Sequence, residues 1–568
     1  MRTLDGGRRL TGPNFLLPCE GAAVEVTFDP DELPSRAKAT WLRRATAMLR
    51  GIGWQERGFT VQWRLRRHAT GASWAFSAPI DQLLVAADIA EYAVDPKPLG
   101  TWRQARQTLI ERSHAEANSK LERLQHWARQ HGVAFLWDTE VVSLGLGPSC
   151  LCWPIGDLPE PEELEPERFD RIPSAYVTGT NGKTTTARLL SKMARCANLH
   201  VGTTTTDGWG IDGVMIEGGD WTGPGAARKV LRDPRVELAV LEAARGGLLR
   251  RGLAHTMADV AIVTNASDDH LGEWGIDTVA DMLRAKLVVA QGIRSGGVLV
   301  ANADNPPSVD VLRNPGAVPE GIDIAWFGLS PFSDMLQQAM KTPSEVAFAR
   351  DGKLVWQRGT HLVHVVDVAE VPICFGGSAC HNIENALAAI LGAHAMGLPW
   401  EAIREGLRTF TSNVYDNPGR ANVFALNGAK VVVDFAHNPD GIRHIVALAK
   451  AIPAARCLIT LGQAGDRSDQ AFADLVDQAV QLGADHYVLK ESLHYLRGRA
   501  LGEVTGHMRA RLLQHGVSER QISVAMDEGA ALDHALVWLR PGDLLVLLIH
   551  DDFAAALARL QAAGALPA

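Results

Sequence analysis

The stretch Pro173-Ser-Ala-Tyr-Val-Thr-Gly-Thr-Asn-Gly-Lys-Thr-Thr-Thr-Ala-Arg-Leu-Leu190 decides the fold class of this chain. An apolar run, Ala175–Val177, leads into the glycine loop Gly179-Thr-Asn-Gly182, and a helical pattern starts immediately after the loop. Glycines let backbone N–H groups approach a phosphate, and the N-terminus of a helix favours a negative charge. The order strand, loop, helix therefore predicts a phosphate-binding site.

Two residues directly after the loop strengthen this prediction. Lys183 is placed to neutralise the β- and γ-phosphates of a nucleotide, and the hydroxyl of Thr184 is placed to hold Mg²⁺. The full Walker pattern has a further glycine where this chain has Val177, so the motif is the shorter Gly-x-x-Gly-Lys-Thr form. An ordinary glycine turn at a strand–helix junction is the alternative. We predict an ATP and Mg²⁺ site.

Composition excludes several classes of protein. The 568 residues suffice for three or four domains, and 46% apolar with 21% charged residues is typical of a soluble globular protein. A formal charge of −9 argues against nucleic acid as a partner. No run reaches the roughly 18 apolar residues of a membrane span, and the N-terminus lacks the apolar core of a signal peptide. Seven scattered cysteines favour a reducing, cytoplasmic location.

The acidic, proline-rich segment 158–170 is the clearest domain boundary. Its like charges and prolines favour a solvated linker that separates an N-terminal region, 1–157, from the phosphate-loop domain. Within the N-terminal region, Ala23–Phe28 and Phe59–Leu65 read as strands, and 101–132 reads as one long helix. We place a central ATP-binding domain at 171–415 and a C-terminal domain at 416–568.

Apolar runs alternate with helical stretches from residue 171 onward, which predicts α/β domains with mostly parallel sheets. The predicted strands are Val236–Leu241, Val260–Thr264 and Gly297–Ala301 in the central domain, and Lys430–Val433, Cys457–Leu461, His486–Leu489 and Leu544–Ile549 in a second, Rossmann-like domain. Ligands bind beyond the carboxyl ends of such strands. Gly179, Glu242 and Asn265 all fall at such ends, and Asp269 with His270 follows shortly after one.

Several motifs in the same order resemble the Mur ligase family, which includes folylpolyglutamate synthases and the peptidoglycan amino-acid ligases. Within it, the chain is most similar to the Mur-like half of the cyanophycin synthetases, over about 171–550. The motifs that carry this resemblance are Val201-Gly-Thr-Thr-Thr-Thr-Asp-Gly, Gly219-Asp-Trp-Thr-Gly-Pro, Val230-Leu-Arg-Asp-Pro, Ala244-Arg-Gly-Gly-Leu-Leu-Arg-Arg-Gly, His381-Asn-Ile-Glu-Asn, Val433-Asp-Phe-Ala-His-Asn-Pro, Gly465-Asp-Arg-Ser-Asp and Leu496-Arg-Gly-Arg-Ala-Leu-Gly-Glu.

The resemblance implies roles for residues around the nucleotide. It implies catalytic residues (Lys183, Glu242, His270, Lys286 and Arg420), metal ligands (Thr184, Glu242, His270 and Lys286) and nucleotide contacts (Gly179, Thr180, Asn181, Gly182, Lys183, Thr184, Thr185, Asn385, Arg420, Asp434 and His437). Lys286 matches a lysine that some Mur ligases carry as a carbamate, whose oxygens suit Mg²⁺. The alternatives are a helix cap for Glu242 and His270, a surface lysine for Lys286, and a simple turn after a strand for Asp434.

Substrate positions are implied less directly. The acceptor is expected near Thr204, Thr205 and Asp207, and guanidinium groups of Arg245, Arg250 and Arg251 are suited to its carboxylates. Ordinary surface arginines are the alternative for these three. The incoming amino acid is expected near Asp466, Arg467, Arg497 and Arg499.

The chain departs from the cyanophycin synthetases at one place. Leu10-Thr-Gly-Pro-Asn14 resembles the opening of their N-terminal domain, and Val141-Val-Ser-Leu-Gly-Leu-Gly resembles the start of their ATP-grasp domain, yet the acidic segment follows within about ten residues. We therefore expect the ATP-grasp domain, which adds aspartate to the backbone, to be missing. The N-terminal region is then expected to hold an acceptor chain or a partner protein.

The expected reaction is ATP-dependent, ADP-forming amide synthesis through an acyl phosphate. The expected substrates are an acidic, cyanophycin-like peptide and a free amino acid, arginine or another basic one. The alternatives are a different acidic acceptor, such as a β-aspartyl dipeptide or polyglutamate, and a non-catalytic companion of a full-length synthetase. A separate ATP-grasp protein is a further expected partner, and we expect a homo-oligomer.

Overall fold

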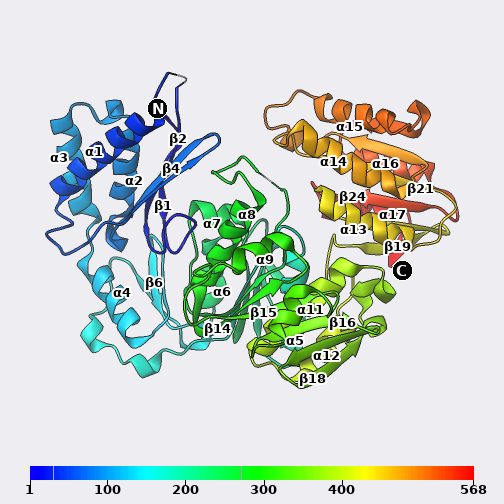
Figure 1. The fold of residues 1–568 in the computed structure, drawn as a ribbon, viewed down its shortest axis with the longest axis horizontal. Coiled ribbons are helices and arrows are strands. Elements are labelled where there is room, and N and C mark those ends of the chain that lie inside the picture. The colour runs from blue at the N-terminus through cyan, green and yellow to red at the C-terminus, as the bar shows by residue number, and fades with distance from the viewer. Residues whose placement is uncertain (30, 270, 568) are drawn as a thin grey trace. The chain divides into compact units, whose positions relative to one another are not determined.

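The computed structural model describes residues 1–29, 31–269 and 271–567. Contacts within the chain divide it into two compact units (Figure 1). The first comprises residues 1–348 with 356–363 and 387–403, and the second comprises 349–355, 364–386 and 404–568. No described helix combines the length and the apolar character that crossing a membrane requires.

The N-terminal region of the first unit is an α+β fold. Its antiparallel sheet has the order β1-β2-β4-β3, with β1 (Arg2–Leu10), β2 (Gly21–Thr27), β4 (Gly71–Ser77) and β3 (Trp63–His68). The helices are α1 (Pro34–Ile52), α2 (Leu83–Val94), α3 (Trp102–Glu116) and α4 (Ser119–His131), of which the first three gather on one side of the sheet (Figure 1). Trp41, Trp54 and Trp74 are buried between helices and sheet, so this region has a substantial core of its own.

Two sequence predictions for this region were wrong in detail. The stretch 101–132 forms α3 and α4 instead of one helix, because Asn118 adopts a non-helical conformation and caps α4 with its side chain. The Asn118 backbone N–H also donates to Asp81 (2.8 Å), a tertiary contact that the local pattern does not reveal. The strand predicted at Phe59–Leu65 lies at Trp63–His68, because residues 59–62 belong to the loop after α1.

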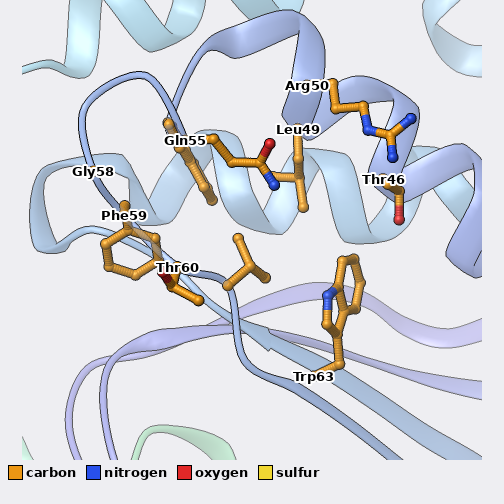
Figure 2. Close-up of a pocket in the computed structure, with 10 residues that line it drawn as sticks. Thr46, Leu49, Arg50, Gln55, Gly58, Phe59, Thr60 and Trp63 are labelled. Carbon is orange, nitrogen blue, oxygen red and sulfur yellow. The ribbon is translucent and has the colours of Figure 1, made fainter.

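A surface pocket of about 370 Å³ opens between the C-terminal half of α1 and the loop that leads to β3 (Figure 2). Aromatic side chains of Trp54, Phe59 and Trp63 line it, together with Arg50 and Gln55. Trp54 is fixed because its indole N–H donates to Gln82 (3.3 Å). The pocket thus belongs to the N-terminal core and is remote in sequence from the phosphate loop.

The acidic segment 158–170 is held against the N-terminal core, which differs from a free linker. Leu158 and Phe169 are buried in that core, and Glu160 forms ion pairs with Lys120 (2.8 Å) and Arg123 (2.5 Å). A small sheet precedes the segment, with β5 (Phe135–Trp137), β6 (Val141–Leu144) and β7 (Leu151–Pro154). The sequence analysis recognised the charged residues of this segment, but not that Leu158 and Phe169 would be buried in the core.

A large sheet follows, in the order β11-β10-β9-β12-β8-β13-β14-β15-β16-β17-β18. Strands β9, β12, β8, β13, β14, β15 and β16 pair in parallel, while β10 and β11 form an antiparallel hairpin at one edge. The bounds are β8 (Ser174–Thr178), β9 (Val201–Thr204), β10 (Gly208–Ile211), β11 (Val214–Gly218), β12 (Leu238–Glu242), β13 (Ala258–Val263), β14 (Ile293–Asn302), β15 (Asp323–Gly328), β16 (Glu345–Arg350), β17 (Lys353–Arg358) and β18 (His361–Asp367).

Helices alternate with these strands, as the apolar runs predict. They are α5 (Lys183–Cys196), α6 (Pro224–Arg232), α7 (Arg245–Arg250), α8 (Val279–Lys286), α9 (Pro306–Leu312), α10 (Asp334–Ala339), α11 (Cys380–Ala395) and α12 (Trp400–Thr409). Strands β8, β12 and β13 are buried along their whole length, which is why they read as continuous apolar runs. Glu242 pairs in register with Val177, and Thr178 with Val263, so three strand ends share one edge of the sheet.

The second unit contains a seven-stranded sheet in the order β23-β22-β21-β24-β20-β19-β25. The strands are β19 (Asn422–Leu426), β20 (Ala429–Asp434), β21 (Cys457–Leu461), β22 (His486–Lys490), β23 (Ile522–Ala525), β24 (Leu544–Leu548) and β25 (Leu566–Pro567). Helices α13 (Pro439–Lys450), α14 (Asp469–Ala479), α15 (Glu503–Gln514), α16 (Glu528–Trp538) and α17 (Phe553–Ala562) accompany it. Five adjacent strands, β23, β22, β21, β24 and β20, are parallel, which confirms the predicted second α/β domain.

Candidate active site

The glycine loop connects β8 to α5 in a shape that needs both of its glycines. Gly182 has φ +85°, a left-handed conformation, and stands directly before the first turn of α5. A Cβ added at Gly179 would lie 1.8 Å from the Thr264 hydroxyl oxygen, so no larger residue fits there. The loop is therefore closely packed against the end of β13.

Residues after β13 hold the loop through its backbone. Thr180 N–H donates to the Asn265 carbonyl oxygen (3.0 Å), and Asn181 N–H donates to the Asn265 side-chain oxygen (2.9 Å). The Thr264 hydroxyl donates to the Asn181 carbonyl oxygen (2.6 Å). Since these bonds do not use the lysine that follows, the loop keeps its shape independently of that side chain.

Three side chains predicted to act together lie at the start of α5 and the end of β12. The Thr184 hydroxyl donates to Glu242 Oε2 at 2.9 Å, and both residues are buried, with exposed fractions of 4% and 2%. Lys183 Nζ donates to the Thr180 carbonyl oxygen at 3.0 Å, on the same loop. A hydroxyl and a carboxylate this close are hard oxygen donors, which fit Mg²⁺. The arrangement therefore suits a metal beside nucleotide phosphates.

Lys286 is the last residue of α8 and is only 3% exposed. Burial, and then the charge of Lys183, lower the pKa of its ammonium well below the usual value, while Asp269 acts in the opposite direction. A neutral amine is a nucleophile, whereas an ammonium is not. The environment thus suits covalent modification of Lys286 by CO₂. His270, predicted as a metal ligand next to Asp269, lies outside the described residues.

The predicted acceptor residues stand in two places of the first unit. Thr204 ends β9 and is 1% exposed, and Thr205 donates to the Gly208 carbonyl oxygen (3.1 Å) within its own turn. Asp207 pairs with Arg188 on α5 at 2.7 Å. These residues form the turn beside α5, and some of their hydrogen-bonding and charged groups already have partners within the protein.

The second group of predicted acceptor residues consists of the arginines of α7. Arg245 pairs with Glu273, and the guanidinium of Arg250 lies 5.3 Å from the ring centroid of Trp274. Both partners lie on the loop that connects β13 to α8. Sequence reasoning named the arginines but not Glu273 or Trp274, which carry no local signal.

The nucleotide contacts implied by resemblance near residues 385–437 belong to the second unit. Asn385 is buried on α11, and its amide donates to the Asn382 side-chain oxygen (3.1 Å). Asp434 accepts the backbone N–H groups of Ala421 and Ala436, each at 2.7 Å. Burial raises the pKa of Asp434, whereas the charge of Arg420 lowers it.

Two further side chains lie close to this group. The guanidinium of Arg420 lies 4.6 Å from the ring centroid of Phe435, and His437 Nδ1–H donates to the Phe435 carbonyl oxygen (3.0 Å). The structure therefore brings Arg420, Asp434 and His437 together at the end of β20.

The four residues predicted for the incoming amino acid also come together in the second unit. Asp466 forms an ion pair with Arg497, and Arg467 lies 4.0 Å from the same carboxylate. Arg499 instead pairs with Glu503 (2.6 Å) and donates to the Arg467 carbonyl oxygen (3.0 Å). Arg499 thus holds the loop after β21, while the side chain of Arg497 is the more exposed of the two arginines.

One polar neighbour of the Thr184–Glu242 pair was missed by sequence reasoning. The Thr206 hydroxyl lies 3.2 Å from that of Thr184. Thr206 is the last of four consecutive threonines, the first two of which lie in β9. The sequence shows these threonines, but not that the hydroxyl of Thr206 lies toward α5.

Comparison with known proteins identifies two domains. The Mur ligase middle domain matches residues 177–393, and the domain described as "Mur ligase, glutamate ligase domain" matches 419–548. Cyanophycin synthetase of Synechocystis sp. is 38% identical over 66% of this chain and 42% of its own length. That of Trichormus variabilis is 36% identical over 70% of this chain and 43% of its own length.

More distant relatives are peptidoglycan enzymes. UDP-N-acetylmuramoyl-L-alanyl-D-glutamate–2,6-diaminopimelate ligase of Geobacillus thermodenitrificans is 29% identical over 54% of this chain and 60% of its own length. Among solved structures, E. coli FolC in complex with ADP covers 69% of this chain and 89% of its own, at 19% identity and a TM-score of 0.48. The chain spans about two fifths of the length of the cyanophycin synthetases that it matches. Residues 177–548 contain the Mur ligase middle and C-terminal domains, and the chain belongs to the Mur ligase family.

Proposed function

We propose that this protein is an ATP-dependent, ADP-forming ligase that joins the amine of an amino acid to a carboxylate of an aspartate-containing peptide. The observation that carries the proposal is the buried pair of Thr184 and Glu242 beside Lys183 at the glycine loop. The names of the relatives, all synthetases or ligases, support the reaction class. The matched domains fall within 171–415 and 416–568, which we propose as the two ligase domains, after 1–157 and the segment 158–170.

The mechanism follows from the chemistry of these residues. An oxygen of the acceptor carboxylate attacks the γ-phosphorus of ATP, the bond to ADP breaks, and an acyl phosphate forms. The amine nitrogen then attacks the acyl carbon and loses a proton, and inorganic phosphate leaves with the electron pair of the broken C–O bond. Lys183 stabilises the charge that develops on the transferred phosphoryl group. A magnesium ion held by Thr184, Glu242 and a modified Lys286 would neutralise phosphate charge.

We also propose substrate contacts for residues of the second unit. Asn385, Arg420, Asp434 and His437 would contact the nucleotide, and Asp466 with Arg497 would hold the incoming amino acid. Arginine heads the candidates because the chain resembles the Mur-like half of the cyanophycin synthetases, and a carboxylate such as Asp466 suits a basic amino acid. The candidate protein partners are a separate ATP-grasp protein and a full-length synthetase.

Two alternatives compete with this proposal. In one alternative, the acceptor is a β-aspartyl dipeptide or polyglutamate. In the other, the chain is a non-catalytic companion of a full-length synthetase. The retained contact between Thr184 and Glu242, next to Lys183, argues against a companion that has lost catalysis. A screen of ATP-dependent phosphate release over acceptor and amine pairs, with products identified by mass spectrometry, separates the three. Release with an aspartyl peptide and a basic amino acid supports the first, and release with no pair contradicts it.

The proposed modification of Lys286 gives a specific prediction. We expect Lys286→Ala to lower phosphate release, and acetate or formate to restore part of it, because a short carboxylate replaces the carbamate oxygens. In the wild type, carbon-13-labelled bicarbonate should give a carbamate signal by NMR that Lys286→Ala lacks. Lys286→Arg serves as the control that keeps a charge but forms no carbamate. An unmodified, solvent-facing ammonium in a nucleotide-bound structure would contradict the prediction.

A further inference from the structure

Four arginines meet where the end of β1 runs beside the end of α7. Arg8 and Arg9 lie on β1, Arg250 ends α7, and Arg251 follows it. The guanidinium groups of Arg8 and Arg250 lie 4.8 and 5.3 Å from the ring centroid of Trp274, and Arg251 Nη1 donates to the Arg9 carbonyl oxygen (3.5 Å). We call Arg8, Arg9, Arg250 and Arg251 the arginine cluster.

The backbone around the cluster is built for close approach. Thr11 N–H donates to the Arg251 carbonyl oxygen (2.7 Å). A Cβ at Gly12 would lie 2.2 Å from the Leu253 carbonyl oxygen, so only glycine fits there. Gly252 has φ +92°, and a Cβ on it would lie 2.6 Å from the Gly12 carbonyl oxygen. These contacts fix the N-terminal strand against α7 and thereby hold arginines of both together.

One arginine of the cluster already binds a carboxylate. Arg8 Nη2 donates to Glu25 Oε1 at 2.7 Å, and both side chains are largely buried. Burial acts to raise the pKa of Glu25, but the hydrogen bond from His68 and the charge of Arg8 bring it below its usual value. Glu25 is therefore ionised and neutralises Arg8.

The other three arginines carry charge that their surroundings do not neutralise. Over residues 1–29, 31–269 and 271–567, no carboxylate forms an ion pair with Arg9, Arg250 or Arg251. Burial, and then the charges of Arg9, Arg250 and Arg8, lower the pKa of Arg251. Burial raises the pKa of Glu116, and the charge of Arg9 acts in the opposite direction. The two carboxylate oxygens of Glu116, however, accept backbone N–H groups of α2 at 2.7 and 2.9 Å. The cluster therefore carries a local excess of positive charge.

Helix α7 connects the cluster to the candidate active site. It begins three residues after Glu242 and ends at Arg250, and Arg245 at its start acts electrostatically on Lys286. Six helical residues span roughly 9 Å at 1.5 Å per residue. An extended peptide covers about 3.3–3.6 Å per residue, so about three residues pass along the helix. A peptide of roughly five or six residues would therefore reach both places.

We propose that the arginine cluster binds carboxylates of an acidic peptide whose reacting carboxylate lies at the phosphate loop, so that β1 forms part of the acceptor site. The inference deepens the proposed ligase function and rests on it. Guanidinium groups form strong, charge-assisted hydrogen bonds with carboxylates, and two arginines of this region already pair with one, in Arg8–Glu25 and Arg245–Glu273. Trp274 contributes a rigid ring between two guanidiniums and adopts φ +53°, a conformation uncommon for a bulky residue.

The chain's charge favours a peptide over a nucleic acid. A formal charge of −9 repels a long polyanion over most of the surface, whereas a short acidic peptide meets only the local cluster. Nucleic acid is therefore an outcome that the test must separate from the proposal.

Binding of fluorescein-labelled hexa-aspartate to the full chain, measured by fluorescence anisotropy without nucleotide, tests the inference. We expect R9Q/R251Q to weaken binding at least about tenfold, since two charge-assisted contacts to the peptide are lost. R9K/R251K should retain most of the affinity, because it keeps the charges. R313Q, an exposed arginine at the end of α9, is the matched control and should bind as the wild type does. Thermal unfolding of each variant verifies the fold.

The outcomes separate this inference from the proposed function. Binding of R9Q/R251Q within twofold of the wild type would overturn the inference, as would equally tight binding of hexa-asparagine or of a short single-stranded DNA. Phosphate release is measured separately with the wild type. Tight, cluster-dependent binding of hexa-aspartate without phosphate release from any acceptor would refute the ligase and leave the acidic-peptide site standing.

Discussion

Lys183→Ala is expected to abolish ATP-dependent phosphate release and to leave the fold intact. The glycine loop is held by backbone bonds to Asn265 and by the Thr264 hydroxyl, so removal of the lysine side chain leaves these contacts in place. The ammonium, in contrast, is placed to stabilise the charge that develops on the transferred phosphoryl group. Loss of such a contact costs about 2.7–4 kcal/mol, or roughly a hundredfold to a thousandfold in rate.

The measurement is phosphate release at saturating ATP with the best acceptor and amine from the screen. Lys341→Ala, an exposed lysine after α10, is the matched control and should release phosphate at the wild-type rate. Circular dichroism and thermal unfolding should coincide for the three proteins. Retention of more than about a tenth of the activity, a loss below ~1.4 kcal/mol, would show that Lys183 does not contact the transferred phosphate.

The geometry of the glycine loop and its neighbours was predictable because its signals are local or depend on a general rule of parallel sheets. The glycine loop, Lys183 and Thr184 are consecutive, and the strand-end rule places Glu242 at the same edge although 58 residues separate it from Thr184. Strands β8, β12 and β13 were recognisable because burial on both faces requires continuous apolar runs.

Features that depend on contacts between distant segments were not predictable in the same way. Arg9 and Arg251 are 242 residues apart in the sequence, yet the Arg251 side chain donates to the Arg9 carbonyl oxygen. No local pattern indicates this contact or the close approach of the backbone at Gly12 and Gly252. The break at Asn118 likewise arises from a tertiary bond to Asp81. The sequence motifs containing Gly12 and Gly252 were quoted for family resemblance, yet their physical role, close backbone approach, required the structure.

The second unit contains a buried ion pair that sequence reasoning did not anticipate. Lys490 ends β22 with an exposed fraction of 2%, and its ammonium donates to Glu528 Oε2 and to the Leu548 carbonyl oxygen (2.6 Å). Glu528 begins α16 and also accepts the backbone N–H groups of His550 (2.6 Å) and Asp552 (3.2 Å). One carboxylate and one ammonium thus join β22, β24, α16 and the loop after β24.

Glu528→Gln is expected to destabilise the second unit by about 3–5 kcal/mol, because it leaves the Lys490 ammonium buried without its counter-charge. Burial lowers the pKa of Lys490, and the charge of Glu528 acts against this shift. Glu528 therefore favours the charged form of the buried lysine. Hydrogen exchange of peptides from β22 and β24 measures the loss within this unit alone. Asp533→Asn breaks the exposed pair with Arg559 (2.8 Å) and serves as the control, with an expected loss below about 1 kcal/mol.

Lys490→Met in the Glu528→Gln background completes a double-mutant cycle. Because the second change removes the uncompensated ammonium, the double variant should be more stable than Glu528→Gln alone, although each single change destabilises. A pair that merely filled space would give additive losses instead. Equal exchange rates in Glu528→Gln and Asp533→Asn would show that the buried pair contributes no more than a surface contact, and that the strand ends around Lys490 are held by their backbone bonds.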